Sequence, residues 1–138
     1  SDLYPKQLSG GMKKRVDIAR AYANEPRVLL MDEPFGSLDV ITKSNMQNEL
    51  LKILRVEEKT VVLITHDLEE ALYLGDKVII LTERPAKIKR VIDVPFDRPR
   101  TQDIKAEKEF QELRQSSSKD LGIYSEGGSC DADKRQKK

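Results

Sequence analysis

The chain has 138 residues, enough for one domain at most, and 36% of them are charged. Its 25 basic and 24 acidic side chains nearly balance, which argues against the large positive excess typical of nucleic-acid-binding proteins. The single cysteine, Cys130, excludes an internal disulfide and suits a reducing compartment, and no apolar run is long enough to cross a membrane. Because the chain begins with Ser1 and its first residues read like the interior of a domain, we expect a fragment of a longer protein.

Segments with helical and strand patterns alternate along most of the chain. Helices are predicted from apolar residues at helical spacing and from capping residues, and strands from short runs of β-branched and aliphatic residues. In chain order we expect a helix over 9–23, a strand over 28–31, a helix over 39–56, a strand over 60–65, a helix over 68–74, a strand over 78–81, a weaker strand over 87–94 and a polar helix over 103–115. This alternation predicts an α/β unit with a largely parallel sheet.

The last part of the chain, residues 116–138, has a different composition. It contains Ser and Gly runs, few apolar residues and a basic end, and we expect it to be a disordered tail after a C-terminal helix over 101–115. Its basic end could contact nucleic acid or anionic lipid, although a solvated terminus is the commoner meaning of so few charges.

Two of the predicted strands are followed by carboxylate and histidine side chains that could take part in catalysis or metal binding. One is followed by Asp32-Glu33-Pro34 and the other by Thr65-His66-Asp67. Ligands bind outside the carboxyl ends of parallel strands, and two adjacent carboxylates there are costly unless solvent or a cation meets them. One could support a hydrated Mg²⁺ while the other takes a proton from water. Alone, Asp-Glu-Pro is more simply a strand end followed by a turn.

The predicted first helix begins with Ser9, Gly10 and Gly11. A polar residue and two glycines at a helix start expose backbone N–H groups, and the helix dipole adds partial positive charge, so an anion can dock. The alternative is an ordinary helix cap with a flexible entry.

Taken together, the motifs resemble those of the ABC transporter ATPases. The resemblance covers roughly residues 3–100, with four motifs in the order and approximate spacing of the family: a signature motif at 8–12, a Walker B strand at 28–34, a D-loop at 37–39 and a switch-histidine loop at 65–67. Segments 46–51 and 84–88 are most similar to the ATPases of nitrate, sulfonate, taurine and bicarbonate importers.

The resemblance implies a role for each site residue. Asp32 would support Mg²⁺, usually through water, Glu33 would be the general base, and His66 would contact the γ-phosphate of ATP. The signature residues Ser9, Gly10 and Gly11 would meet ATP held by a second ATPase subunit. Asp39 would lie at the dimer seam.

The sequence also departs from the family pattern. Asp17 stands where a small or apolar residue is usual, and it either faces solvent or needs a partner in the core; Tyr22 in place of Leu is a milder change. The P-loop motif Gly-x-x-x-x-Gly-Lys-Ser/Thr does not occur in these residues, and neither do the family's Q-loop and adenine-stacking aromatic. In the family, the P-loop strand lies beside the strand that matches 60–65. Without it, neighbouring strands would expose backbone groups and apolar faces.

We therefore expect a partial P-loop NTPase fold of the ABC type that lacks the P-loop strand and most of the helical subdomain. The resemblance implies a parent protein that hydrolyses ATP as a dimer on the cytoplasmic face of the membrane, joined to transmembrane permease subunits and indirectly to a solute-binding protein. The chain alone is expected neither to bind ATP tightly nor to hydrolyse it. Two alternatives stay open: a non-catalytic truncated partner of an intact ATPase subunit, and a soluble ATPase outside transport.

Overall fold

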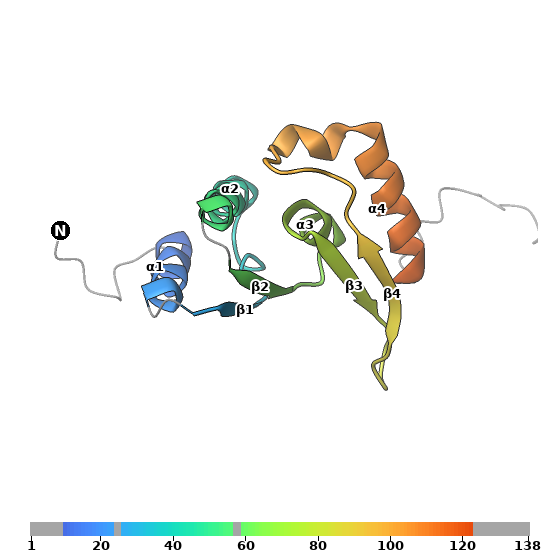
Figure 1. Ribbon diagram of the computed structural model, residues 1–138, viewed down its shortest axis with the longest axis horizontal. Helices are drawn as coiled ribbons and strands as arrows, with labels where there is room; N and C mark the ends of the chain where they lie inside the picture. Colours follow the sequence, from blue (N-terminus) through green and yellow to red (C-terminus); the bar gives the residue numbers. More distant parts are fainter. Residues whose placement is uncertain (1–9, 24–25, 57–58, 123–138) are drawn as a thin grey trace, which may run out of the picture.

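A computed structural model describes residues 10–23, 26–56 and 59–122 (Figure 1). The elements in chain order are α1 (Gly10–Ala23), β1 (Val28–Asp32), α2 (Val40–Val56), β2 (Thr60–Ile64), α3 (Leu68–Leu74), β3 (Lys77–Leu81), β4 (Ile88–Asp93), the short 3₁₀ helix η2 (Gln102–Ala106) and α4 (Lys108–Asp120). Each helix and strand expected from the sequence is present, with ends that differ by a few residues at most outside the C-terminal segment. None of the described helices is long and apolar enough to span a membrane.

The strands form two separate pairs. β1 and β2 are parallel, with Val28 opposite Thr60 and Asp32 opposite Ile64, whereas β3 and β4 are antiparallel. β4 turns back on β3 because the connection between them is a short hairpin, and a parallel return needs a long crossover. β2 and β3 do not pair with each other in the described part of the chain. The described strands thus form two separate two-stranded sheets.

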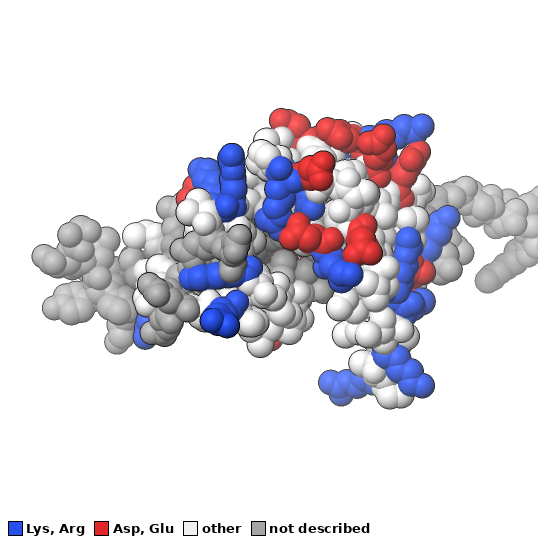
Figure 2. Space-filling model, viewed as in Figure 1, with Lys and Arg blue, Asp and Glu red and all other residues white. Residues whose placement is uncertain are grey.

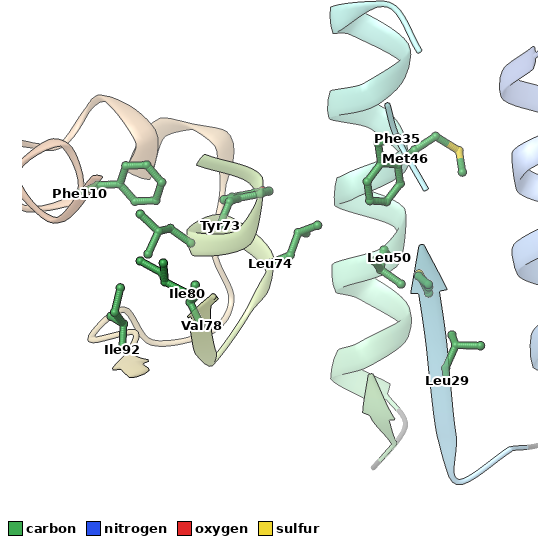
Figure 3. Packing of buried hydrophobic residues seen from close by; sticks show 12 residues of the cluster. Leu29, Phe35, Met46, Leu50, Tyr73, Leu74, Val78, Ile80, Ile92 and Phe110 are labelled. Carbon is green, nitrogen blue, oxygen red and sulfur yellow. The ribbon is translucent and has the colours of Figure 1, made fainter. Parts of the chain in front are cut away.

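The apolar core lies between the helices and one face of each strand pair. Figure 3 shows Leu29, Phe35, Met46 and Leu50 gathered around β1 and α2. A second group, centred on Tyr73 and Phe110, packs β3 and β4 against α3 and α4; its other members are Val78, Ile80 and Ile92. The Phe110 and Phe96 rings add a tilted aromatic pair with centroids 5.6 Å apart.

The opposite faces of the strands carry exposed apolar side chains. Buried and exposed positions alternate strictly along β1 and β3, as expected for strands with one covered face. The exposed set comprises Val28, Leu30, Val62, Ile64, Ile79, Leu81, Ile88 and Val91. Exposed apolar side chains thus occur on both strand pairs.

The C-terminal helix extends further than its composition suggests. α4 continues to Asp120, and Ser117 within the Ser-rich run is fully buried. The Arg90 guanidinium contacts the Asp120 carboxylate at 2.8 Å, and the Lys89 ammonium donates to the Asp120 carbonyl. Burial of Ser117 and the two contacts at Asp120 thus accompany a helix over 116–120, although serine has low helix propensity. Residues 123–138, the rest of the expected tail, lie outside the described residues.

Two arginines close the C-terminal end of α3. The buried Arg100 guanidinium donates to the carbonyls of Phe96, Leu72, Tyr73 and Gly75, and Arg98 donates to the Leu74 carbonyl at 2.7 Å. The last carbonyls of a helix have no partner within the helix, and positive charge there is favourable. These contacts fix the segment after β4 to the helix that follows His66.

Charge is spread over the surface in both signs, in keeping with the net charge of +1. Figure 2 shows acidic side chains over η2 and α4 and basic ones at the tip of the β3–β4 hairpin, where Arg84 and Lys87 are exposed. Asp17 is exposed on α1, so in this structure its carboxylate faces solvent and needs no partner in the core.

Candidate functional site

The parallel pairing of β1 and β2 brings the two predicted motifs to one edge. The ladder places Asp32 opposite Ile64, and the Glu33 backbone N–H donates to the Ile64 carbonyl at 2.9 Å. Both strands end at this point, so the residues that follow them, Glu33 and His66, emerge side by side. This is the place where open parallel sheets bind ligands.

Glu33 and His66 are joined by two hydrogen bonds. The His66 backbone N–H donates to Glu33 Oε1 at 2.9 Å, and the His66 ring Nδ1 lies 2.8 Å from the same oxygen. The Glu33 side chain is 39% exposed and that of His66 is 81% exposed, so both can meet a ligand from solvent. The hydrogen bond to the Glu33 carboxylate, helped by its negative charge, raises the pKa of His66. The pair is an exposed acid–base unit.

The backbone of Glu33 has an uncommon conformation. Its φ is +45°, in the left-handed region that residues other than glycine seldom adopt. The same residue still donates its N–H to β2 and turns its carboxylate back toward His66. Strain of this kind persists where the surrounding contacts impose it, and it concentrates at functional sites. The residue with this unusual backbone conformation, Glu33, is the one predicted from the sequence to be the general base.

Asp32 is exposed at the end of β1, next to this pair. Within the described ranges, no group of three or more His, Cys, Asp and Glu side chains is placed to hold a metal ion. A single carboxylate nevertheless fits Mg²⁺, which keeps several waters and is often bound by one or two carboxylates together with substrate phosphates. Asp32 is therefore suited to share a magnesium ion with a nucleotide.

Asp39 has a structural role in the described chain. Its carboxylate accepts a hydrogen bond from the Thr42 backbone N–H at 3.0 Å, and its carbonyl accepts one from the Lys43 N–H at 2.8 Å, so it caps the start of α2. The hydrogen bonds from Thr42 lower the pKa of Asp39. The structure thus places Asp39 at a helix start, apart from the Glu33–His66 pair.

The predicted signature residues are only partly described. Gly10 and Gly11 form the first turn of α1, as the sequence predicted, whereas Ser9 lies outside the described residues. Their expected ligand is a nucleotide held by another subunit, so their role stays a prediction.

One feature near the site is not visible in the sequence motifs. The Lys43 ammonium on α2 lies 2.6 Å from Asp67 Oδ2 and 3.2 Å from Glu70 Oε1, and Gln47 donates to the same Glu70 oxygen at 3.1 Å. The partners are more than 20 residues apart in sequence. The i, i+4 spacing of Lys43 and Gln47 shows that they share a helix face, but nothing local says that this face meets α3.

Comparisons with known proteins find relatives in the family that the motifs resemble. A family model described as "ABC transporter" matches residues 1–36. The chain is 54% identical over 104 residues to a nitrate import ATP-binding protein of Synechococcus elongatus, covering 75% of this chain and 38% of that protein. It is 45% identical over 120 residues to an aliphatic sulfonates import ATP-binding protein of Bacillus licheniformis, covering 86% of this chain and 45% of that protein.

Solved structures give the same result. A dimeric ATP-binding cassette in a post-hydrolysis state, bound to ADP and Pi, is 38% identical, with a TM-score of 0.56 over 67% of this chain and 39% of that one. The chain spans less than half the length of the relatives described here, as it does for an ABC transporter ATP-binding protein of Methanocaldococcus jannaschii, of which it covers 37%.

Proposed function

The chain belongs to the ATP-binding proteins of ABC transporters, and on this premise we propose that it is the C-terminal part of the ATP-hydrolysing subunit of an importer. The observation that supports this most directly is the Glu33–His66 pair at the joint carboxyl end of β1 and β2, with Asp32 beside it. These three residues hold the positions of the Walker B and switch-histidine motifs.

The geometry gives each residue a task in hydrolysis. Both hydrogen bonds from His66 go to Glu33 Oε1, and among the contacts of the described residues Oε2 remains available to accept a proton from an attacking water. A raised pKa favours the cationic form of His66, which suits contact with a γ-phosphate. Asp32 would hold Mg²⁺, which neutralises charge on the phosphates when it is bound.

The remaining parts of the site would come from elsewhere. The phosphates of a nucleotide are cradled by a P-loop, and that motif does not occur in these 138 residues. Ser9, Gly10 and Gly11 would meet the nucleotide of a second ATPase subunit, and Asp39 would lie near the seam between the two. On this proposal the chain alone does not bind ATP tightly.

The transported solute is proposed from the sequence resemblance and from the relatives. The nitrate and aliphatic sulfonate import proteins among the relatives support a small anion such as nitrate or a sulfonate, and the sequence resemblance adds taurine as a candidate. The parent would then act at the cytoplasmic face of the membrane as a peripheral subunit, with permease subunits as direct partners and a solute-binding protein as an indirect one.

A chimera tests the catalytic assignment. Residues 1–122 replace the matching segment of the Synechococcus elongatus nitrate import ATP-binding protein, and steady-state ATP hydrolysis and nucleotide binding are measured. We expect the chimera to hydrolyse ATP, and Glu33→Gln to lower the rate by about 100-fold or more while ATP still binds. The control is Glu49→Gln, which removes an exposed carboxylate on α2 that pairs with nearby Lys52. Equal rates for the Glu33→Gln and Glu49→Gln chimeras would contradict the assignment.

A calorimetric titration of the 138-residue chain with Mg-ATP tests the second part of the proposal. Absence of tight binding is expected, whereas micromolar binding would mean that these residues hold phosphates without a P-loop. A pull-down with an intact ATPase subunit, with and without ATP, tests the alternative of a non-catalytic partner: ATP-dependent capture of the chain would favour it.

A further inference from the structure

Lys43 connects two parts of the proposed site. It lies in the first turn of α2, where its backbone N–H donates to the carbonyl of Asp39 at 2.8 Å. Its ammonium group leaves the helix and reaches the start of α3, at 2.6 Å from Asp67 and 3.2 Å from Glu70. One residue therefore contacts both the D-loop aspartate and the residue that follows His66.

The surroundings make this contact a specific one. The Lys43 side chain is 24% exposed and that of Glu70 is 2% exposed, so the ion pair is largely removed from water. Glu70 also accepts a hydrogen bond from the buried Gln47. Breaking a pair of this kind leaves an uncompensated charge in a poorly hydrated place, which costs far more than loss of an exposed surface pair.

The turn that carries His66 is fixed on its far side by the same contacts. The Asp67 carboxylate caps α3 by accepting from the Glu70 backbone N–H at 3.2 Å, and the Asp67 N–H donates to Thr65 Oγ1 at 3.1 Å. Two neighbouring residues of one turn are thus held from two sides. Lys43 binds Asp67, and Glu33 binds His66.

We propose that Lys43 is a positioning residue that anchors the His66 turn to the start of α2, so that His66 stays in hydrogen-bond contact with Glu33. The inference rests on the proposed function, in which His66 contacts the γ-phosphate and Asp39 lies at the dimer seam. It assigns to Lys43 the mechanical link between these two elements. Lys43 lies outside the four sequence motifs.

Because His66 is the only histidine in the chain, NMR can follow it without ambiguity. The full 138-residue chain is labelled with ¹⁵N, and hydrogen exchange of the His66 amide and the pKa of its ring are measured without nucleotide. We expect Lys43→Gln to accelerate exchange of that amide by about tenfold, the order for loss of one charge-assisted hydrogen bond. The matched control is Lys52→Gln, which removes an exposed lysine from the same helix and should leave both quantities unchanged.

The direction in which the pKa of His66 changes in Lys43→Gln tells whether Lys43 positions the turn or acts only through its charge. If Lys43 acts only through its charge, its removal leaves the Asp67 and Glu70 carboxylates uncompensated, and the pKa of His66 rises. If Lys43 positions the turn, the hydrogen bond that the His66 ring donates to Glu33 weakens, and the pKa of His66 falls toward its ordinary value. A fall supports the proposal, and a rise or no change overturns it.

Two further variants guard against a folding defect. Asp67→Asn keeps a good helix cap but loses the ion pair, so it should accelerate exchange of the His66 amide even if Lys43→Gln fails to fold. Lys43→Arg should restore slow exchange. If Asp67→Asn and Lys52→Gln give the same His66 exchange rate, the proposal is refuted. Since no measurement involves ATP, these results are independent of whether the parent protein is an importer ATPase.

Discussion

Leu29 and Leu30 are adjacent residues of the same type in β1, and they face opposite sides of the sheet. Leu29 is 5% exposed and lies in the core beside α2, whereas Leu30 is 66% exposed on the uncovered apolar face. Replacing each in turn with alanine removes the same atoms from the same strand. The pair therefore measures what the two faces of β1 contribute to stability.

The expected costs follow from the burial of each side chain. Leu29→Ala deletes buried atoms and leaves a cavity, which costs about 2–5 kcal/mol in comparable cores. Leu30 hides only a third of its surface, and full burial of a leucine is worth about 1.5–3 kcal/mol, so Leu30→Ala should cost roughly 0.5–1 kcal/mol. We expect a difference of about 1 kcal/mol or more between the two free energies of unfolding.

Urea denaturation of the 138-residue chain, followed by far-ultraviolet circular dichroism, gives both free energies of unfolding. Sedimentation at several concentrations shows whether the uncovered face drives association, which Leu30→Ala should weaken. Equal costs for the two variants in a monomeric sample would refute the assignment of one covered and one open face. Equal costs that appear only in an associated sample would instead show that a second copy covers Leu30.

Three other predictions follow from particular contacts. Glu33→Gln should lower the pKa of His66, as measured by NMR. Because the pKa of His66 is raised in the folded chain, the pair stabilises the fold fully below the ordinary pKa of about 6.5, and this stabilisation is lost as pH rises through the folded pKa. The Glu33→Gln variant should lack this pH dependence. Phe110→Ala removes a fully buried ring and should cost about 3–5 kcal/mol in urea denaturation, and a cost under about 1 kcal/mol would show that α4 is not docked. Arg100→Met leaves several α3 carbonyls without a donor and should cost about 3 kcal/mol, against nearly nothing for the exposed Arg114→Met control.

Local signals in the sequence were sufficient for the elements and for the centre of the site. Helical spacing, the Asp67 cap and short β-branched runs depend on neighbours within a few residues, and the structure confirms a helix or strand at each of those places. The sequence also indicates that Glu33 and His66 follow strand ends, where parallel sheets bind ligands, but the direct contact between them is a finding of the structure.

Contacts between distant segments were decided only by tertiary packing. Nothing near Lys43 indicates that its ammonium meets Asp67, because that contact requires α2 and α3 to pack side by side. Ser117 reads as part of a polar tail, yet burial against the rest of the C-terminal unit keeps it helical. The division of the strands into two pairs likewise depends on which backbone edges find partners. A one-dimensional pattern records the propensity of each segment, whereas the free energy of docking two segments depends on surfaces that only the fold brings together.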